Sequence, residues 1–500
     1  MKATMHINPH FKIDKIDDRI YGAFVEHQGR TVYDGIYEPG HPLADDMGFR
    51  TDVLKLVKDM NIPIIRYPGG NFVSNYNWED GVGPKELRPR IAEAAWQSAE
   101  TNEIGTDEFH EWAKRVGSSV MMAVNLGTKG QEEARNLFEY CNFKAGTKYA
   151  DMRVKNGIEE PYNDRLWCLG NEMDGEWQIG HRTPEDYADI ARKTALMLKR
   201  LDPTVELVAC GSACYYMPTF GKWEAAVLEA AYHNIEYISL HQYYIDEGGD
   251  TATYLGATED MHRFIKRVAA TCDYVKGIKR TDKVINLSFD EWNVWSTNRC
   301  CDNEDKLWEA APPREEYIYS MENALVFGGM LITLLKNCDR VKIACLAQLV
   351  NVAAPIMTVH GGPSWVQPTY YPFVYTSKYG RGTALQPVVE CGSYHTDKYG
   401  GIPYIDAVAI LSDDASELTV FALNRSQDEA CELSVDMRDF AGFEPVEHVV
   451  MEHEDIFAVN SAENPDNVKP RSNGVTRIED GMAAIALNKL SWNMIRFEKR

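Results

Sequence analysis

Apolar runs typical of buried strands alternate with amphipathic patterns typical of helices over most of the chain. Strands are expected at 19–26, 62–68, 119–126, 165–172, 205–211, 235–243, 284–292 and 340–350. Helices are expected between them, at 52–61, 106–116, 132–141, 184–201, 223–232 and 314–337. Because each helix can carry the chain back to the starting edge of the sheet, all the strands can run parallel. The segment 119–124 is apolar at almost every position, which is typical of a strand buried on both faces.

This alternation predicts an α/β fold built on a (β/α)8 TIM barrel, in which parallel strands close into a cylinder with helices outside. The alternative is an open doubly wound sheet, which would use a glycine-rich phosphate-binding turn after its first strand. The sequence that follows 19–26 contains no such turn. We therefore favour the barrel.

The pattern changes after Arg381, where short strands of alternating polar and apolar residues follow one another between turns. These strands are expected at 407–411, 417–423, 430–435, 482–487 and 491–497. They predict a C-terminal antiparallel β-sandwich of jelly-roll-like type. Residues 1–16 also alternate, and we expect them to add an edge strand to the sandwich. The expected domains are the barrel at 17–380 and the sandwich at 381–500 plus 1–16.

The net charge of −23 comes from 75 acidic and 52 basic side chains. It would repel nucleic acids and anionic membrane surfaces, and it suits a protein that acts on neutral partners such as sugars. No segment has the composition of a transmembrane helix, and the N-terminus lacks the apolar core of a secretory signal. The eleven cysteines, including the adjacent Cys300 and Cys301, show no disulfide-framework or metal-site spacing. We therefore expect a cytoplasmic protein with reduced thiols.

Two glutamates follow apolar strands at corresponding positions. Asn171 and Glu172 come after one strand, and Asp290 and Glu291 end another, about 120 residues later. That separation corresponds to three βα units, and in a parallel barrel both carboxylates would lie at the C-terminal mouth. Two carboxylates that face each other can cleave a glycosidic bond, one as acid and the other as nucleophile or base. Each glutamate alone could simply cap a helix, but the pair favours catalysis.

Other polar side chains are expected at the same mouth, because they too end barrel strands. They are Glu26, His27, Arg66, Asn71, Asn125, Asn171, His241, Tyr243 and Gln348. The amide and hydroxyl groups of Asn171, Tyr243 and Gln348 suit the recognition of sugar hydroxyls. Arg66 near a carboxylate would hold that carboxylate ionised, as a nucleophile requires, and the alternative is an ordinary salt bridge inside the barrel.

A metal site like that of a barrel isomerase is another possible use of these side chains. Its ligands would be Glu26, His27, His241 and Glu291. No His-x-His or paired-carboxylate spacing in the sequence supports such a site. We therefore expect neither a metal nor an organic cofactor.

Five segments closely resemble the α-L-arabinofuranosidases of glycoside hydrolase family 51, and the resemblance covers essentially the whole chain. The segments are 21–27 (YGAFVEH), 66–72 (RYPGGNF), 77–84 (NWEDGVGP), 170–175 (GNEMDG) and 290–295 (DEWNVW). The resemblance implies that Glu172 is the general acid/base and that Glu291 is the nucleophile of a retaining mechanism. It also implies a pocket for one arabinofuranose ring, lined by Glu26, Arg66, Asn71, Asn171, Tyr243 and Gln348, with His241 beside the nucleophile and Trp96 and Trp295 near the aglycone. Gln28 departs from the pattern, where an apolar residue such as leucine is expected, and this difference could alter the pocket rim.

The predicted function is a retaining, exo-acting α-L-arabinofuranosidase that releases terminal arabinofuranose from arabinan, arabinoxylan or their oligosaccharides. We expect the loops 298–313 and 360–368, with Trp308 and Trp365, to form an outer rim that accepts varied aglycones. Related enzymes are commonly oligomeric, so a homo-oligomer, either a trimer or a hexamer, is expected. One alternative is an endo-glycanase on xylan or β-glucan, which would need an open cleft. The other is a non-catalytic sugar-binding barrel, against which the glutamate pair argues.

Overall fold

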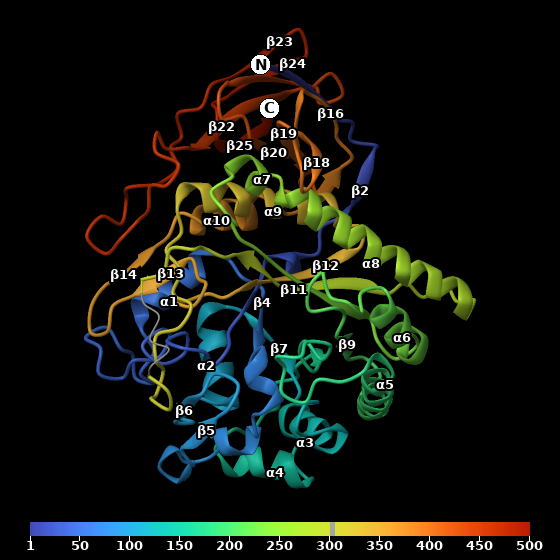
Figure 1. Cartoon of the computed structure of the whole chain (residues 1–500), viewed down its shortest axis with the longest axis vertical. Coiled ribbons are helices and arrows are strands. Elements are labelled where there is room, and N and C mark those ends of the chain that lie inside the picture. Colours follow the sequence, from blue (N-terminus) through green and yellow to red (C-terminus); the bar gives the residue numbers. More distant parts are fainter. Residues whose placement is uncertain (301–305) are drawn as a thin grey trace.

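The computed structural model describes residues 1–300 and 306–500, and its central element is a closed barrel of parallel strands (Figure 1). Around the barrel the strands follow the order β10-β11-β12-β3-β4-β7-β8-β9. Their bounds are β3 (Gly22–Phe24), β4 (Ile64–Tyr67), β7 (Ser119–Ala123), β8 (Leu166–Leu169), β9 (Glu206–Ala209), β10 (Tyr237–Tyr244), β11 (Asn286–Val294) and β12 (Val341–Ala347). All eight coincide with expected strands to within three residues at the C-terminal end, so the predicted (β/α)8 barrel is confirmed.

The helices surround the barrel and join its strands. They are α1 (Thr51–Asp59), α2 (Thr106–Val116), α3 (Gln131–Asn142), α4 (Lys148–Lys155), α5 (Pro184–Leu201), α6 (Lys222–Ala231), α7 (Thr251–Leu255), α8 (Ala257–Lys279), α9 (Met321–Lys336) and α10 (Tyr370–Tyr379). Helix α5 begins where expected, because the Thr183 hydroxyl accepts a hydrogen bond from the Asp186 amide and proline occupies the first helical position. The helix expected at 314–337 begins only at Met321, since Ser320 is extended, pairs with Val459 and caps the helix. The long helix α8 was not expected.

Short 3-10 helices and two-stranded sheets lie between the larger elements. The 3-10 helices are η1 (Asp18–Tyr21), η2 (Asn71–Ser74), η3 (Trp78–Gly81) and η4 (Lys85–Leu87). Three two-stranded sheets pair β5 (Ile91–Glu93) with β6 (Ser98–Glu100), β13 (Ile356–Thr358) with β14 (Ser364–Val366), and β17 (Ser393–Thr396) with β18 (Gly400–Pro403). The first two lie in loops that follow barrel strands, and they therefore extend the mouth where functional groups are expected.

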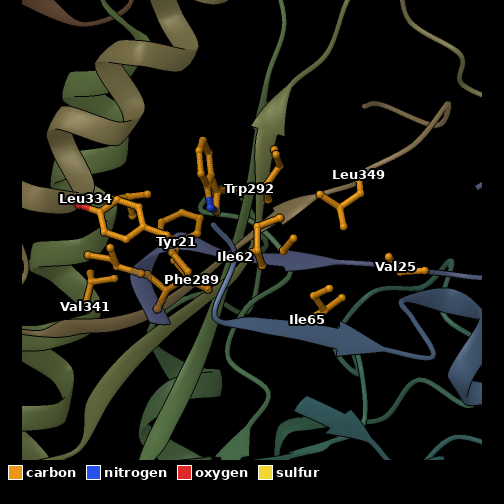
Figure 2. Close-up of a cluster of buried hydrophobic side chains, with 14 of the residues drawn as sticks. Tyr21, Val25, Ile62, Ile65, Phe289, Trp292, Leu334, Val341 and Leu349 are labelled. Carbon is orange, nitrogen blue, oxygen red and sulfur yellow. The ribbon is translucent and has the colours of Figure 1, made fainter. Parts of the chain in front are cut away.

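Alternate residues of the barrel strands belong to two different cores. Figure 2 shows part of the outer core, where Ile65, Phe289 and Trp292 from the strands are buried in one cluster with Leu334 of α9. The barrel interior has its own cluster, which includes Phe24, Met121, Cys168, Val208, Tyr237, Ile343 and Cys345. The near-continuous apolar character of the strands follows from this burial on both faces.

The C-terminal part of the chain and the first fifteen residues together form two packed sheets. One has the order β16-β1-β21-β24-β23 and the other β2-β15-β19-β20-β25-β22. The strands are β1 (Lys2–His6), β2 (Lys12–Lys15), β15 (Thr383–Leu385), β16 (Val388–Glu390), β19 (Ile405–Leu411), β20 (Glu417–Asn424), β21 (Cys431–Asp436), β22 (Phe443–Met451), β23 (Thr476–Glu479), β24 (Met482–Leu487) and β25 (Ser491–Lys499). The expectation of an N-terminal edge strand was right for β2 and wrong for β1, which lies between β16 and β21 and runs parallel to β21. The division of the chain at residues 16/17 and 380/381 stays a prediction.

Helix α9 lies between the barrel and the two sheets, and both chain ends lie in the sheet-rich part (Figure 1). A Cβ at Gly328 would lie 2.4 Å from Cδ1 of the Trp492 indole, so glycine allows the helix and β25 to approach closely. Nearby, Asp406 is buried and accepts hydrogen bonds from Lys336 Nζ at 2.8 Å and Arg425 Nη2 at 2.7 Å. These contacts join the two parts of the molecule firmly, which favours a fixed orientation over a swinging one.

Over residues 1–300 and 306–500, no helix combines the length and the apolar character that are needed to cross a membrane. The ten cysteines in this part of the chain all carry free thiols. Cys300 is exposed and its Sγ lies 3.3 Å from Glu316 Oε2, whereas Cys301 lies outside the described residues.

Candidate active site

A cavity of about 450 Å³ opens at the C-terminal ends of the barrel strands. Nine of the predicted site residues line it: Glu26, Asn71, Trp96, Asn171, Glu172, Tyr243, Glu291, Trp295 and Gln348. The remaining two, Arg66 and His241, are buried behind its wall. There Arg66 Nη1 lies 2.7 Å from Glu291 Oε1, and His241 Nδ1 lies 3.5 Å from Glu291 Oε2. The structure therefore brings these eleven side chains together at one point. His27 and Asn125, which were also expected at the mouth, do not line the cavity.

Glu291 lies in β11 and is buried beside donors that satisfy both of its oxygens. Arg66 Nη1 donates to Oε1 at 2.7 Å, and the Tyr243 hydroxyl donates to Oε2 at 2.9 Å. Burial raises the pKa of Glu291, while the positive charges of His241 and Arg66 oppose that rise. Since every donor at this position favours the ionised group, the arrangement suits a carboxylate.

Glu172 lies three residues beyond the end of β8 and has a left-handed backbone conformation, with φ of 42°. Non-glycine residues rarely adopt this conformation, and its presence at a cavity wall is typical of functional sites. His241 Nδ1 lies 2.9 Å from Glu172 Oε1, and Trp177 Nε1 donates to Oε2 at 2.6 Å. Each carboxyl oxygen of Glu172 therefore receives an N–H group.

His241 connects the two acidic strand ends. Its Nδ1 contacts Glu172, and its Nε2 lies 2.9 Å from Asp290 Oδ1. Burial alone would lower the pKa of His241, but the charge of Glu291 and the hydrogen bonds to Asp290 and Glu172 outweigh it and raise this pKa to about 10. At neutral pH the ring is therefore an imidazolium that donates from both nitrogens.

Asn171 is held in one orientation by its neighbours. Arg66 Nη2 donates to Asn171 Oδ1 at 2.6 Å, and Asn171 Nδ2 donates to Gln178 Oε1 at 3.2 Å. Because a guanidinium can only donate, the oxygen of Asn171 must face Arg66 and its amino group must face away. The second hydrogen of that amino group is available to a ligand in the cavity.

Glu26 closes another side of the cavity. Its Oε1 accepts hydrogen bonds from the Phe72 amide at 2.8 Å and from Trp96 Nε1 at 3.0 Å. A Cβ at Gly70 would lie 2.5 Å from Glu26 Oε2, so this position needs glycine. Burial raises the pKa of Glu26 to about 8, and the nearby charge of Glu291 adds to that rise. Glu26 therefore carries a proton at neutral pH and can donate it in a hydrogen bond to a hydroxyl group.

Gln28 was expected to affect the rim of the pocket, but it lies in the cavity wall. The backbone amide of Glu26 donates to Gln348 Oε1 at 2.8 Å, and Gln348 Nε2 donates to Gln28 Oε1 at 2.7 Å. Gln28 Nε2 in turn donates to Glu315 Oε2 at 2.8 Å. This series of hydrogen bonds fixes the orientation of the Gln348 amide. An apolar residue at position 28 could not form them.

The predicted aromatic residues take two different positions. Trp295 stacks on Tyr243 with ring centroids 4.8 Å apart, and both rings line the cavity with Trp96. Trp308 and Trp365 do not line the cavity. Residues 301–305 of the loop at 298–313 lie outside the described ranges. The expected outer rim therefore stays a prediction.

The sequence reasoning gave no role to four side chains that contact the predicted ones: Trp177, Gln178, Asp290 and Glu315. Asp290 was placed at the strand end beside Glu291, but no function was assigned to it. Trp177 and Gln178 lie in the loop after β8, which reaches the barrel mouth by the same rule that located Glu172.

The metal-site alternative is not supported by the positions of its expected ligands. His27 bonds to Glu100 Oε2 at 2.9 Å and to Tyr67 Oη at 2.8 Å. Among the described residues, two other groups have ligand atoms within 4.8 Å of one another, namely Glu172, His241 and Glu291, and Asp34, Glu38 and His360. In the first group both nitrogens of the His241 imidazolium carry hydrogens and offer no lone pair to an ion.

Comparison with known proteins gives matches over the whole chain. Residues 56–259 match the model of the α-L-arabinofuranosidase 1 domain, and residues 290–491 match that of the α-L-arabinofuranosidase C-terminal domain. A protein of Halalkalibacterium halodurans named intracellular exo-α-(1→5)-L-arabinofuranosidase is 52% identical over 100% of both chains. A protein of Bifidobacterium longum named exo-α-(1→6)-L-arabinofuranosidase is 45% identical over 99% of this chain and 97% of its own. Among solved structures, a family 51 α-L-arabinofuranosidase from Bifidobacterium longum has a TM-score of 0.94 at 42% identity, over 99% of each chain.

Proposed function

Because the chain belongs to the α-L-arabinofuranosidases of glycoside hydrolase family 51, we propose that it works by retention, with Glu172 as general acid/base and Glu291 as nucleophile. The chain is an exo-acting α-L-arabinofuranosidase. The roles of its individual residues are our proposal.

One observation carries the proposal. A carboxyl oxygen of Glu172 and one of Glu291 lie within 4.8 Å of each other, with His241 Nδ1 between them. Retaining glycosidases place their two carboxyl groups about 5–5.5 Å apart, whereas inverting enzymes need about 6.5–9.5 Å to admit a water. Carboxyl oxygens this close to each other favour the shorter separation, and they support direct attack by a carboxylate.

In the first step, protonated Glu172 gives its proton to the glycosidic oxygen while Glu291 attacks the anomeric carbon. The bond to the leaving group breaks, and an arabinosyl ester forms on Glu291. In the second step, deprotonated Glu172 takes a proton from water, which displaces Glu291 and releases arabinose with its original configuration.

The groups around Glu291 fit this role. Arg66 and Tyr243 hold the carboxylate in place and stabilise its charge before attack and after release. His241 and Arg66 place two positive charges among Glu172, Glu291 and Asp290, which lowers the cost of holding several carboxylates in one buried site.

The shape of the cavity supports an exo mode. Donors and acceptors from six barrel strands or the loops that follow them meet in a space of about 450 Å³, which suits one sugar held at each hydroxyl. An endo-glycanase would need an open cleft instead. A time course on branched arabinan tests this: free arabinose should be released from the earliest times, and early oligosaccharides with little monosaccharide would contradict an exo mode.

We further propose that the natural substrates are arabinan, arabinoxylan and their oligosaccharides, with several linkages accepted. The relatives named for 1→5 and 1→6 linkages support tolerance within this family. The intracellular relative supports a cytoplasmic enzyme that processes imported oligosaccharides. A homo-oligomer, either a trimer or a hexamer, is proposed from the family resemblance, and light scattering of the purified protein would test it.

A pair of variants tests the assignment of the two glutamates. Glu291→Ala should lose turnover on every substrate, and azide should not restore it with retained configuration. Glu172→Ala should still form the arabinosyl-enzyme from an aryl arabinofuranoside with a good leaving group, because departure then needs no proton, and should accumulate it. Mass spectrometry of the intact protein detects the ester. Equal loss in both variants, with no trapped ester, would contradict the assignment.

A further inference from the structure

Strand β11 carries one residue more than the strands on either side of it. To reach the paired residue it takes three steps over 288–291, while β10 takes two over 239–241. Its pairing with β12 shows the same excess, three steps against two, over 289–292. An extra residue of this kind is a β-bulge, and bulges beside active sites change the direction of nearby side chains. This bulge includes Asp290 and Glu291.

The bulge turns two consecutive carboxylates into the barrel. Phe289 and Trp292, on either side of the pair, both belong to the outer core (Figure 2). Asp290 and Glu291 are 1% and 5% exposed, and both lie against His241 of β10. Successive residues of a regular strand face opposite sides of the sheet. Without the extra residue, one of the two carboxylates would face the outer core, so the bulge is what places both beside His241.

Asp290 lies between donors on both of its oxygens. Its Oδ1 lies 2.9 Å from His241 Nε2. Its Oδ2 accepts a hydrogen bond from Cys168 Sγ at 3.8 Å and lies 3.9 Å from Arg66 Nε. A guanidinium can only donate, and the imidazolium donates from both nitrogens. The position therefore suits a carboxylate, because both of its oxygens can only accept.

The contact with Asp290 fixes the direction of the opposite edge of the His241 ring. There Nδ1 lies 2.9 Å from Glu172 Oε1 and 3.5 Å from Glu291 Oε2, so it faces the gap between the two proposed catalytic groups. A half turn of the ring about its Cβ–Cγ bond would put carbon atoms in place of both nitrogens and break the contacts at both edges. Asp290 does not line the cavity, so it acts on the reaction through the side chains that it holds.

We propose that Asp290 is a positioning residue of the reaction, brought beside His241 by the β-bulge so that the ring directs an N–H group and its positive charge at the gap between Glu172 and Glu291. This inference rests on the proposed roles of the two glutamates. It adds a third carboxylate, which touches no substrate. It also gives the bulge a function, because a strand without the extra residue could present only one of its two adjacent carboxylates to His241.

Asp290→Asn tests this role because it keeps the size of the side chain and removes its charge. Cys168 and Arg66 are the donors beside Oδ2, so the amide oxygen should take that side. The amide NH2 group then faces His241 Nε2, which must accept and therefore lose its hydrogen. The ring keeps the hydrogen on Nδ1 but becomes neutral, and a neutral donor binds a carboxylate less strongly than a charged one.

Kinetics and NMR measure the two consequences separately. On an α-1,5-linked arabinobiose, kcat should fall roughly 10- to 150-fold, as expected when a charge-assisted hydrogen bond is lost in the transition state. KM should change little, because no group that contacts the substrate is removed. Proton NMR of histidine-labelled protein should show two exchange-protected ring N–H hydrogens on His241 in wild type and one in Asp290→Asn. The signals are assigned by their absence in His241→Gln.

Asp164→Asn is the matched control. His110 Nε2 lies 2.9 Å from Asp164 Oδ2, both side chains are buried, and Asp164 precedes β8, at the end of the barrel away from the cavity. This variant therefore takes the same kind of partner from a histidine that has no part in the reaction. It should lower the temperature of unfolding and leave kcat unchanged. Asp290→Asn should instead lose activity at temperatures where circular dichroism shows that it is fully folded.

A kcat close to that of wild type in folded Asp290→Asn would overturn the inference. So would a fall in kcat with both His241 N–H signals intact. If the variant does not fold, the wild-type spectrum decides: two protected ring hydrogens on His241 support the inference, and a single one contradicts it.

The proposed function fails in a different way. Peptide mapping of the ester trapped in Glu172→Ala would then place it on a residue other than Glu291, whatever the behaviour of Asp290→Asn. An ester on Glu291 together with wild-type kcat in Asp290→Asn would leave the proposed function standing and refute only the role of Asp290.

Discussion

Replacement of Arg66 by methionine removes the guanidinium that lies against the proposed nucleophile. Arg66 is 1% exposed, and its nitrogens lie 2.7 Å from Glu291, 2.6 Å from Asn171 and 3.9 Å from Asp290. Without it, two buried carboxylates share the single positive charge of His241. Removal of one partner of a buried ion pair costs about 3–5 kcal/mol, so we expect the free energy of unfolding at pH 7 to fall by that amount.

Arg66→Lys separates the charge of this side chain from its shape. A lysine keeps the positive charge but cannot present two parallel donors, so one contact, to Glu291 or to Asn171, is lost. A hydrogen bond to a charged group contributes about 1.5–3 kcal/mol. If this stabilisation is needed in the transition state, kcat/KM should fall roughly 10- to 150-fold.

The pH dependence of the two variants should differ. Burial already raises the pKa of Glu291, and loss of the Arg66 charge raises it further. The acid limb of kcat/KM on an activated aryl arabinofuranoside should therefore move to higher pH in Arg66→Met and stay near its original position in Arg66→Lys. Urea unfolding followed by tryptophan fluorescence gives the stability. A methionine variant within about 1 kcal/mol of wild type, with an unshifted acid limb, would refute the reasoning.

Three further predictions concern other parts of the site. Burial raises the pKa of Glu26 from 4.5 to about 8. The contribution of this proton to the free energy of unfolding is therefore complete below pH 4.5 and is lost as the pH rises through about 8. Glu26→Gln should flatten this part of the curve of unfolding free energy against pH, and an unchanged curve would count against the raised pKa. Asn171→Ala should lower kcat, because a hydrogen bond to the hydroxyl beside the reacting carbon strengthens as positive charge develops there, whereas an effect on KM alone would argue for simple binding. Dialysis against EDTA should leave the rate unchanged, and a loss that a divalent cation restores would revive the metal-site interpretation.

The sequence was enough to predict the barrel because each strand had to be apolar on both faces. Periodicity placed α2 and α5 to the residue, since capping residues and a proline fix where α5 starts. It failed at 314–320, where pairing of Ser320 with Val459 keeps the chain extended until α9. Such a contact joins residues far apart in sequence, and no local pattern could reveal it. The inner place of β1 in its sheet has the same origin.

The candidate site, like the fold, could be predicted only in part. The predicted residues were found because barrel strand ends share one mouth, and the family resemblance supplied their roles. What could not be predicted was which partner each polar atom would choose. The orientation of the Gln348 amide depends on Gln28, and one carboxyl oxygen of Glu172 accepts a hydrogen bond from Trp177. These are choices of hydrogen-bond geometry that only the folded arrangement determines.

The central claim is that two glutamates act together in a double displacement. The anomeric configuration of the first-formed arabinose, followed by proton NMR before mutarotation, tests it most directly. The gap of less than 4.8 Å between the carboxyl oxygens of Glu172 and Glu291 predicts that α-arabinofuranose appears first. If β-arabinofuranose appears first, the reaction inverts, and Glu291 cannot be the nucleophile.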